Sequence, residues 1–320
     1  MKTYVTDFFK KLARKENIPM IIYLVLNLIL VFLGTTIAIG FIIMDTQLAN
    51  NDAALFLISV PTSILLYGIG IVIALSPIGE WLLRRKHGCE EITDPATLER
   101  IQPLFDEVHT AAREINPDIA ADVSLYICND VIPNAFATGR KTICINSGLL
   151  NCTDEEIKGV LAHEFGHISN HDTDFTLVVN VANWIVAAYF AVVWVIIMAY
   201  KIMFKGVGLL VSIIQGSIGT FIATILGDAV ATAAILIFIK LTSAIWTFIG
   251  NMLIKASSRK NEFLADKFAK EAGFGTELTG FLNSLADAKH KRSFIEKVAA
   301  LGDSHPETSK RIDALNSLSE

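Results

Sequence analysis

The stretch LAHEFGHISNHD, residues 161–172, holds three of the seven histidines of this 320-residue chain. His163 and His167 stand four residues apart, and Glu164 directly follows the first of them. On a helix, residues at this spacing lie on one face, one turn from each other. Two such imidazoles can hold one metal ion, and the glutamate can point at a water molecule beside it. The pattern predicts a metal site that still needs a third ligand.

The residues before this stretch predict a helix that begins near Thr153. Glu156 follows Thr153 by three positions, which is the spacing of a capping box. Asp154 and Glu155 add negative charge at the positive end of that helix. The two histidines therefore lie on a helix, and its charged first turn excludes the helix from the centre of a membrane, where charge is costly.

Composition indicates a membrane protein. Hydrophobic residues make up 52% of the chain and charged residues 18%, whereas soluble domains have roughly 25% charged residues. The net charge of -5 gives no sign of binding to nucleic acid. A span needs about 20 apolar residues. Four stretches meet this requirement, at 18–44, 53–78, 175–200 and 229–254.

Basic residues flank these stretches unevenly. Five of them precede the first stretch: Lys2, Lys10, Lys11, Arg14 and Lys15. The loop 45–52 has none, and residues 84–86 after the second stretch are all basic. Cytoplasmic loops are enriched in lysine and arginine. We therefore expect cytoplasmic positions for 1–17 and 80–174, and an outer position for 45–52.

The apolar run 207–254 is long enough for one span or two, and the number decides the side on which the C-terminal part lies. Three basic residues that follow the run favour one span, at 229–254, although Lys201 and Lys205 on the outer side weigh mildly against it. Roughly residues 207–227 are then expected to form an interfacial or re-entrant piece. With one span here, residues 255–320 lie on the same side as 80–174, so that the two parts can share one metal site.

The segment SSRKNEFLADKFAKEAGF, residues 257–274, offers the third ligand. Glu262 and Asp266 stand four residues apart on a predicted helix. Glu262 can ligate zinc, and Asp266 can accept the spare N–H of a ligating imidazole. The alternative is an ordinary helix whose two carboxylates face solvent. His171 lies four residues past His167, but zinc rarely takes three ligands from one straight helix, so we expect a surface histidine at the helix end.

The part between the second and third apolar stretches predicts a small α+β domain. A helix is expected over 94–114 and a strand over 123–128. Residues 134–138 and 142–146 are expected to form a hairpin around the turn Gly139-Arg140-Lys141. The four cysteines of the chain form no CxxC pair, so we expect reduced thiols.

Four motifs together resemble the HtpX-type membrane zinc metallopeptidases, relatives of the type I CAAX prenyl proteases. They are HEFGH at 163–167, SSRKNEFLADKFA at 257–269, NAFATG at 134–139 and SHPETSKRIDAL at 304–315. The resemblance implies a mainly α membrane protein. The same resemblance implies four transmembrane helices and an α+β zincin-like metalloprotease domain with a small β-sheet, which the second helix pair would split.

The resemblance also implies roles for residues of this chain. One Zn²⁺ per chain would be held by His163, His167 and Glu262, with Asp266 behind a ligand. Glu164 would take a proton from water and pass it to the leaving amine. Arg311, with His305 nearby, would stabilise the oxyanion, although His305 could instead approach the zinc and plug the site. A substrate-binding edge strand would consist of Asn134, Ala135, Phe136 and Ala137.

The expected function is that of a zinc-dependent membrane endopeptidase in protein quality control and the stress response, which hydrolyses misfolded or damaged membrane proteins. It would be a multi-pass protein of the inner or plasma membrane, with its site facing the cytoplasm. Its partners would be the lipid bilayer and unfolded or membrane-embedded protein chains, with no nucleic acid. The alternatives are a maturation protease of the CAAX type and a zinc-binding scaffold without catalysis.

Self-cleavage is a first testable expectation, because a site with loose sequence preference meets the loops of its own chain first. Purified wild-type protein with zinc should degrade faster than the Glu164→Gln protein, as followed by gel electrophoresis over time. Equal persistence of the two proteins would contradict it.

Overall fold

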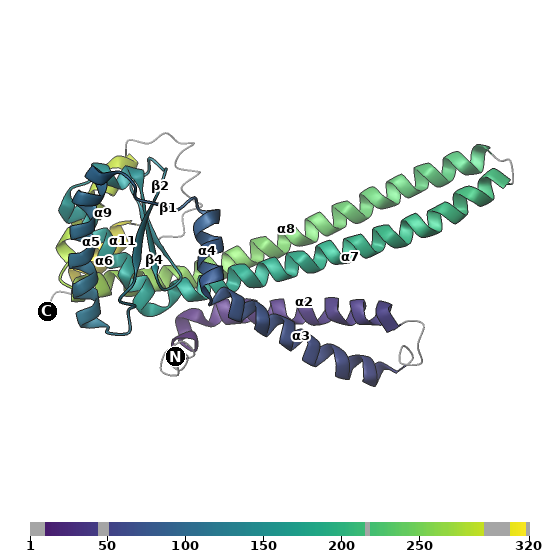
Figure 1. Cartoon of the computed structure of the whole chain (residues 1–320), viewed down its shortest axis with the longest axis horizontal. Coiled ribbons are helices and arrows are strands. Elements are labelled where there is room, and N and C mark those ends of the chain that lie inside the picture. The colour runs from purple at the N-terminus through teal and green to yellow at the C-terminus, as the bar shows by residue number, and fades with distance from the viewer. Residues whose placement is uncertain (1–9, 44–50, 215–217, 291–307, 318–320) are drawn as a thin grey trace. The chain divides into compact units, whose positions relative to one another are not determined.

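The structure is a computed structural model that describes residues 10–43, 51–214, 218–290 and 308–317 (Figure 1). The chain forms two compact units. The first comprises Met1–Ile22, Ile71–Val181 and Leu253–Glu320, and the second comprises Tyr23–Gly70 and Ala182–Met252. The first unit contains the histidine motif, and the second consists of apolar helices.

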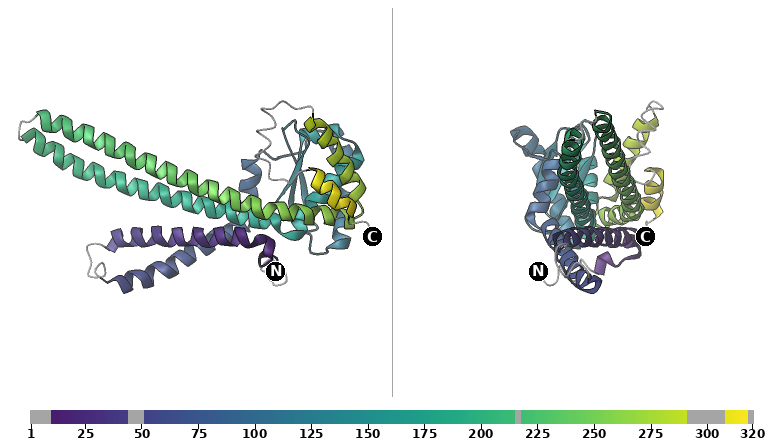
Figure 2. Two further views of the ribbon diagram at one scale, coloured as in Figure 1. Left: turned by 180° about the vertical axis from the view of Figure 1, so that it is seen from behind. Right: turned by 90° about the vertical axis from the view of Figure 1, so that its right-hand side faces the viewer.

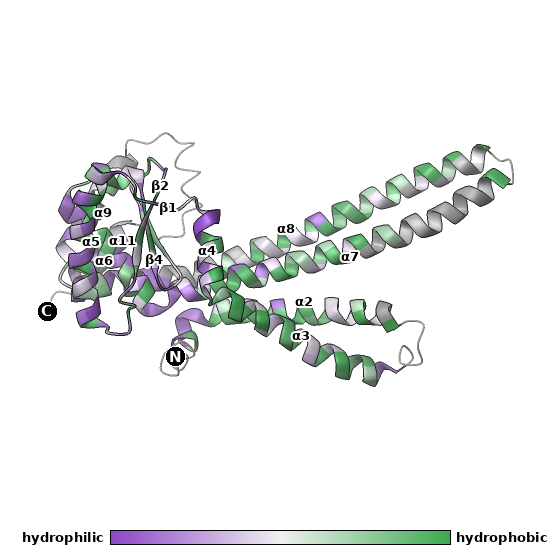
Figure 3. Cartoon of the chain, in the orientation of Figure 1, coloured by the Kyte–Doolittle hydropathy of each residue, from purple (hydrophilic) through white to green (hydrophobic). Residues whose placement is uncertain are grey.

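Apolar helices long enough to cross a membrane occur four times among the described residues. The candidate spans are Lys15–Gly40, Asp52–Ala74, Asp172–Val192 and Ile225–Gly250. They belong to helices α2 (Ile18–Ile43), α3 (Asp52–Ala74), α7 (Asp172–Ile214) and α8 (Ile218–Glu271). Colouring by hydropathy shows that the described residues of these helices are predominantly apolar (Figure 3).

Polar side chains join the helices of the second unit. Tyr23 on α2 donates a hydrogen bond to Asn183 on α7, with an O···O distance of 2.6 Å. Trp246 on α8 donates to Asn27 on α2 at 2.9 Å. Such bonds between helices add to van der Waals contact, which drives the association of helices in lipid. Two views show α7 and α8 side by side along this unit (Figures 1 and 2).

The observed helices differ from the predicted spans at two places. Helix α3 ends at Ala74, before the predicted limit of 78, because Ser76 caps the next helix, α4 (Pro77–Lys86), and Pro77 occupies its first turn. The residue before a proline disfavours helical geometry. The described residues of 201–228 belong to the end of α7 and the beginning of α8, so that α7 extends beyond the predicted limit of 200, and this stretch contains no proline that would interrupt the helices.

The first unit contains a four-stranded sheet in the order β1-β2-β4-β3. Figure 1 labels strands β1, β2 and β4 of this sheet. Strands β3 (Ala135–Thr138) and β4 (Thr142–Asn146) form the predicted antiparallel hairpin, in which Ala135 pairs with Ile145. Strand β2 (Ser124–Cys128) runs parallel to β4. Strand β1 (Glu90–Glu91) was not predicted, because two residues are too short to show a periodicity. Strand β3 is thus an edge of this sheet.

Helix α6 (Asp154–Asn170) is the central element of this unit and contacts strand β3. It also contacts helices α5 (Pro95–Ile115), α9 (Gly275–His290) and, through α9, the helix α11 (Thr308–Ser317). Its side chains Ile157, Leu161 and Phe165, spaced by four residues, are all fully buried. The predicted capping box between Thr153 and Glu156 is present. The four cysteines are free thiols, as expected.

The close contact of α6 with α9 depends on Gly159. A Cβ atom at this position would overlap the backbone of Leu278 and lie 2.7 Å from its Cα atom. We expect Gly159→Ala to lower the free energy of unfolding by about 1–3 kcal/mol, as overpacked cores do. Thermal unfolding in detergent measures the effect. The matched control is Gly280→Ala on α9, because a Cβ atom there would meet no side chain and no atom of another element within 4 Å among the described residues. An equal effect of both substitutions would contradict the role of this contact.

Candidate active site

Three side chains converge from two helices that are distant in the sequence. The Nε2 atoms of His163 and His167 lie 3.2 Å apart. Oε2 of Glu262 lies 3.4 Å from Nε2 of His163, and Oε1 lies 3.5 Å from Nε2 of His167. One ligand atom from each residue lies within 4.8 Å of the others. Two imidazole nitrogens and one carboxylate oxygen form a donor set that suits catalytic zinc, which leaves one position open.

Gly166, inside the HEFGH motif, allows the second helix to come this close. A Cβ atom at position 166 would lie 2.8 Å from the Cα atom of Ala265 on α8. A side chain at this position would push α8 away from α6. The small residues at 166 and 265 therefore allow Glu262 to come within reach of the histidines. The HEFGH motif itself contains this glycine, but the motif does not show which helix packs against it.

The carboxylate of Asp266 holds His163 from behind. Its Oδ1 atom lies 2.8 Å from Nδ1 of His163. Arg311 on α11 donates two hydrogen bonds to the same carboxylate, from Nε at 2.8 Å and from Nη2 at 2.6 Å. Burial raises the pKa of Asp266, but the bonds from Arg311 and His163 outweigh burial and lower it. Asp266 is therefore an anion that fixes the orientation of the His163 ring.

Asp172 plays the corresponding part for His167. Its Oδ2 atom lies 3.1 Å from Nδ1 of His167. Burial lowers the pKa of His167, but the bonds to Asp172 and Glu262 outweigh burial and raise it well above its usual value. These carboxylates favour a cation between the imidazoles. Asp172 was not among the predicted site residues, although its position five residues after His167, just beyond the helix end, was a usable signal.

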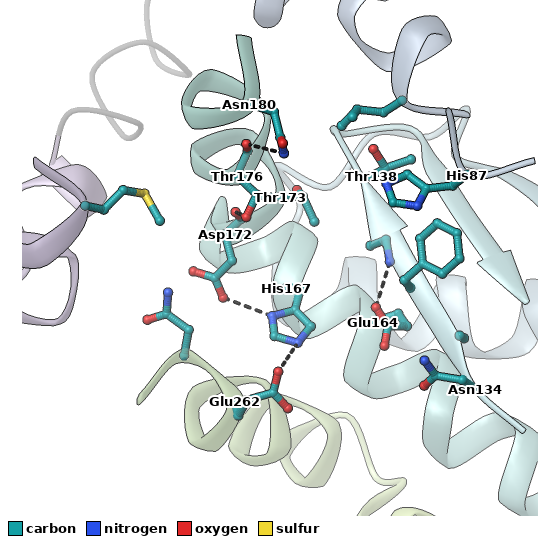
Figure 4. Close-up of a pocket in the computed structure, with 16 residues that line it drawn as sticks. His87, Asn134, Thr138, Glu164, His167, Asp172, Thr173, Thr176, Asn180 and Glu262 are labelled. Carbon is teal, nitrogen blue, oxygen red and sulfur yellow. Dashed lines mark hydrogen bonds and ion pairs between the residues drawn. The ribbon is translucent and has the colours of Figure 1, made fainter. Parts of the chain in front are cut away.

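Glu164 faces a cavity of about 370 Å³ and contacts the edge strand (Figure 4). The backbone N–H of Ala137 donates a hydrogen bond to Oε2 of Glu164 at 2.8 Å. All of residues 134–138 line the same cavity, as do His167 and Glu262. The cavity thus places the acid-base candidate, the metal-ligand candidates and the edge strand around one space.

The structure brings together most of the residues that the sequence singled out. His163, Glu262 and Asp266 are buried and form one cluster with the half-buried His167, and Glu164 lies beside it. Arg311 is also close, but it is buried behind Asp266 and does not line the cavity. His305 lies outside the described residues.

The expectation of a surface histidine at 171 is wrong as to its exposure. His171 caps the end of α6 in the left-handed conformation, with φ of 62°, and only 6% of it is exposed. Its Nδ1 atom lies 2.8 Å from Oδ2 of Asp174. The turn that ends α6 directs it away from the three-residue cluster, so the helix contributes two histidines to the candidate metal site and not three.

A helix-borne histidine pair, a glutamate from a second helix and four apolar helices define a membrane metallopeptidase. Residues 95–319 match the family described as Peptidase family M48. The chain belongs to this family, whose members are in general zinc metalloproteases.

Relatives agree with this assignment. "Protease HtpX" of Shewanella loihica is 27% identical over 301 residues, which cover 84% of this chain and 96% of the relative. "Protease HtpX" of a Psychrobacter species is 26% identical over 272 residues, covering 78% and 80%. Among solved structures, that of S. mikatae Ste24p has 19% sequence identity and a TM-score of 0.40, over 88% of this chain and 62% of Ste24p.

The contact between Asp172 and His167 leads to a test by metal binding. Asp172→Asn keeps the size of the side chain but loses the negative charge that holds the imidazole. We expect zinc affinity to fall about 10- to 100-fold, as for other carboxylates that support a ligand, measured by competition with a chelator. The exposed Asp118 provides the control variant Asp118→Asn. Unchanged affinity in Asp172→Asn would show that the carboxylate has no part in the site.

Proposed function

We propose that this chain is a zinc-dependent endopeptidase in which His163, His167 and Glu262 hold the metal and Glu164 is the general base. The observation that carries the proposal is the convergence of the three donor atoms within 4.8 Å beside a cavity that Glu164 also lines. Zinc, when bound, would supply Lewis acidity for a water molecule and for the carbonyl of the scissile bond.

The residues of the chain would then do three things. Asp266 and Asp172 would keep the two imidazoles oriented, with their Nδ1 atoms directed at the carboxylates and their Nε2 atoms at the metal. Glu164 would take a proton from water and later give it to the leaving amine. The bond from Ala137 N–H holds the Glu164 carboxylate at the edge of the cavity, where a substrate carbonyl would lie.

For Arg311, the geometry favours a positioning role over direct stabilisation of the oxyanion. Its guanidinium is bound by Asp266, and Nη1 lies 3.5 Å from a Glu262 oxygen. Burial lowers the pKa of Arg311, but Asp266 outweighs burial and raises it. A permanent cation at this place would balance the charge of the buried carboxylates and hold both in place. This differs from the role that the sequence resemblance implied.

The substrates would be unfolded protein segments, including those of damaged membrane proteins. Strand β3 is an edge of the sheet and lines the cavity, so an extended chain could add to it through backbone hydrogen bonds. Such pairing reads main chain more than side chains and gives a loose preference. Basic residues flank the spans within 1–17 and at 84–86, and such residues are typical of the cytoplasmic side of a membrane. The site would therefore face the cytoplasm.

The same site bears on two other functions. A maturation protease of the CAAX type would use the same donor set on a defined C-terminal motif. A scaffold that only holds zinc would not need a carboxylate at the position of Glu164, which lines the cavity beside the candidate ligands. The cleavage products of an unfolded protein separate the first alternative, and the variant described next separates the second.

The decisive comparison is between wild type and Glu164→Gln, both purified as full chains in detergent. We expect about one zinc per chain in both, because glutamine at 164 leaves the three proposed ligands unchanged. Cleavage of unfolded casein should fall about 10²- to 10⁴-fold in the variant, as for loss of a general base. Zinc binding without cleavage by wild type would favour the scaffold. Loss of zinc from the variant would give Glu164 a different role.

A further inference from the structure

A groove lies between α7 and α8 within the second unit, away from the candidate active site in the sequence. Its volume is about 460 Å³, and the described residues that line it include no carboxylate. Most of them are apolar, and they include Ala187, Ala191 and Trp194 from α7, and Lys240, Ser243 and Ala244 from α8. A basic side chain thus lines a mainly apolar groove, and the side chain of Lys240 is exposed.

Lys240 stands near the middle of the fourth candidate span, Ile225–Gly250. It is ten residues from Gly250, which corresponds to about 15 Å of helix at 1.5 Å per residue. The hydrocarbon core of a bilayer is about 30 Å thick. Lysines near a helix end extend their ammonium group to the membrane surface, but Lys240 is about half the core thickness from either surface. Phosphate groups of lipids, which lie at the surface, are therefore distant from it.

A lysine at this depth needs an anionic partner, because charge in hydrocarbon is costly and such residues pair with one another. The structure shows no hydrogen bond or ion pair between Lys240 and any residue that it describes. A second copy of the chain would not provide a carboxylate at this depth either. All acidic residues of the four candidate spans stand within the first four positions of their span, namely Glu16, Asp52, Asp172, Asp174 and Asp228.

We propose that this groove docks a transmembrane helix of a substrate protein, in which an aspartate or glutamate near the middle of the helix pairs with Lys240. The small residues Ala187, Ala191 and Ala244 would let the backbone of that helix approach closely. The hydroxyl of Ser243 would offer a second hydrogen bond to the carboxylate. The inference rests on the proposed function in one respect, since it takes the docked protein to be a substrate.

The charge of Lys240 makes the groove selective for membrane proteins that have not assembled. In an assembled membrane protein, an acidic residue at this depth faces the protein interior and is paired. When the protein is damaged or lacks a subunit, the carboxylate loses its partner and becomes accessible from the lipid. Lys240 would bind this carboxylate, whereas a segment that is apolar throughout would gain nothing from the lysine.

The test measures binding to the full-length Glu164→Gln protein, reconstituted with zinc in phosphatidylcholine vesicles. The ligands are dye-labelled single-span helices of leucine and alanine that carry glutamate, glutamine or lysine at the centre. Kd values come from energy transfer to a dye on the protein. The glutamate helix should bind about 5- to 30-fold more tightly than the glutamine helix, the range of polar contacts between model helices in lipid. Adding Lys240→Met, which removes the charge at similar length, should abolish this preference.

Two further variants isolate the charge. Lys267→Met removes an exposed lysine of α8 outside the candidate span and should leave the preference unchanged. Lys240→Glu should shift the preference to the lysine helix. Should Lys240→Glu fail to insert, Lys240→Met is sufficient for the test, because it makes the span more apolar. Equal Kd values for the glutamate and glutamine helices, or a preference that persists in Lys240→Met, overturn the proposal.

Two other occupants of the groove are outcomes of the same experiment. Binding of phosphatidylglycerol that depends on Lys240, without a preference for glutamate, would assign the groove to a lipid. Self-association that depends on Lys240, again without this preference, would assign it to a second copy of the chain. Either result overturns the proposal.

A cleavage measurement separates this proposal from the proposed function. The same helices, extended by an unfolded tail, are given to protein with Glu164 intact in the same vesicles, and casein is given separately. If neither the tail nor casein is cleaved, the proposed function fails, but a glutamate preference in Kd that Lys240→Met removes still supports docking at Lys240. If both are cleaved, with equal Kd and kcat/KM for the glutamate and glutamine helices, only the docking proposal is overturned.

Discussion

The site depends on the close approach of helices α6 and α8 at Gly166 and Ala265. The two histidines and Glu262 are separated by a long apolar part of the chain, and only this contact brings their donor atoms within 4.8 Å. A larger side chain at either place would separate the helices and leave three buried polar groups without one another. Because buried polar groups are costly when unpaired, the helix contact and the cluster stabilise each other.

Around this contact, the carboxylates are arranged in two layers. Glu262 faces both imidazoles, and Asp266 and Asp172 lie behind one imidazole each. Arg311 then faces Asp266 and Glu262, so that negative charge is balanced from the side away from the cavity. A buried carboxylate that lost its partner would destabilise the folded protein by several kcal/mol. The cluster is thus a connected unit, and its members are expected to respond together to a substitution in any one of them.

The cavity joins this cluster to the edge strand, and here the roles of the elements separate. In the proposed mechanism, helix α6 would supply two metal ligands and the general base, while β3 lines the cavity and offers an open backbone edge. The main chain of a proposed substrate would pair with this open edge through backbone hydrogen bonds.

The local elements could be predicted from the sequence alone: the capped helix with His163 and His167, the hairpin around Gly139 and the apolar helices. Periodicity, capping and turn residues act over a few positions, so they are visible in a short window. The spacing of Glu262 and Asp266 on a predicted helix, supported by a motif resemblance, also identified these two residues as candidates. Which atoms meet became apparent only in the folded chain, with Asp172 behind His167, Arg311 behind Asp266 and not at the cavity, and His171 buried at the helix cap. Such contacts depend on the angle and distance between packed helices, and these follow from side-chain packing across the whole unit, which no local pattern encodes.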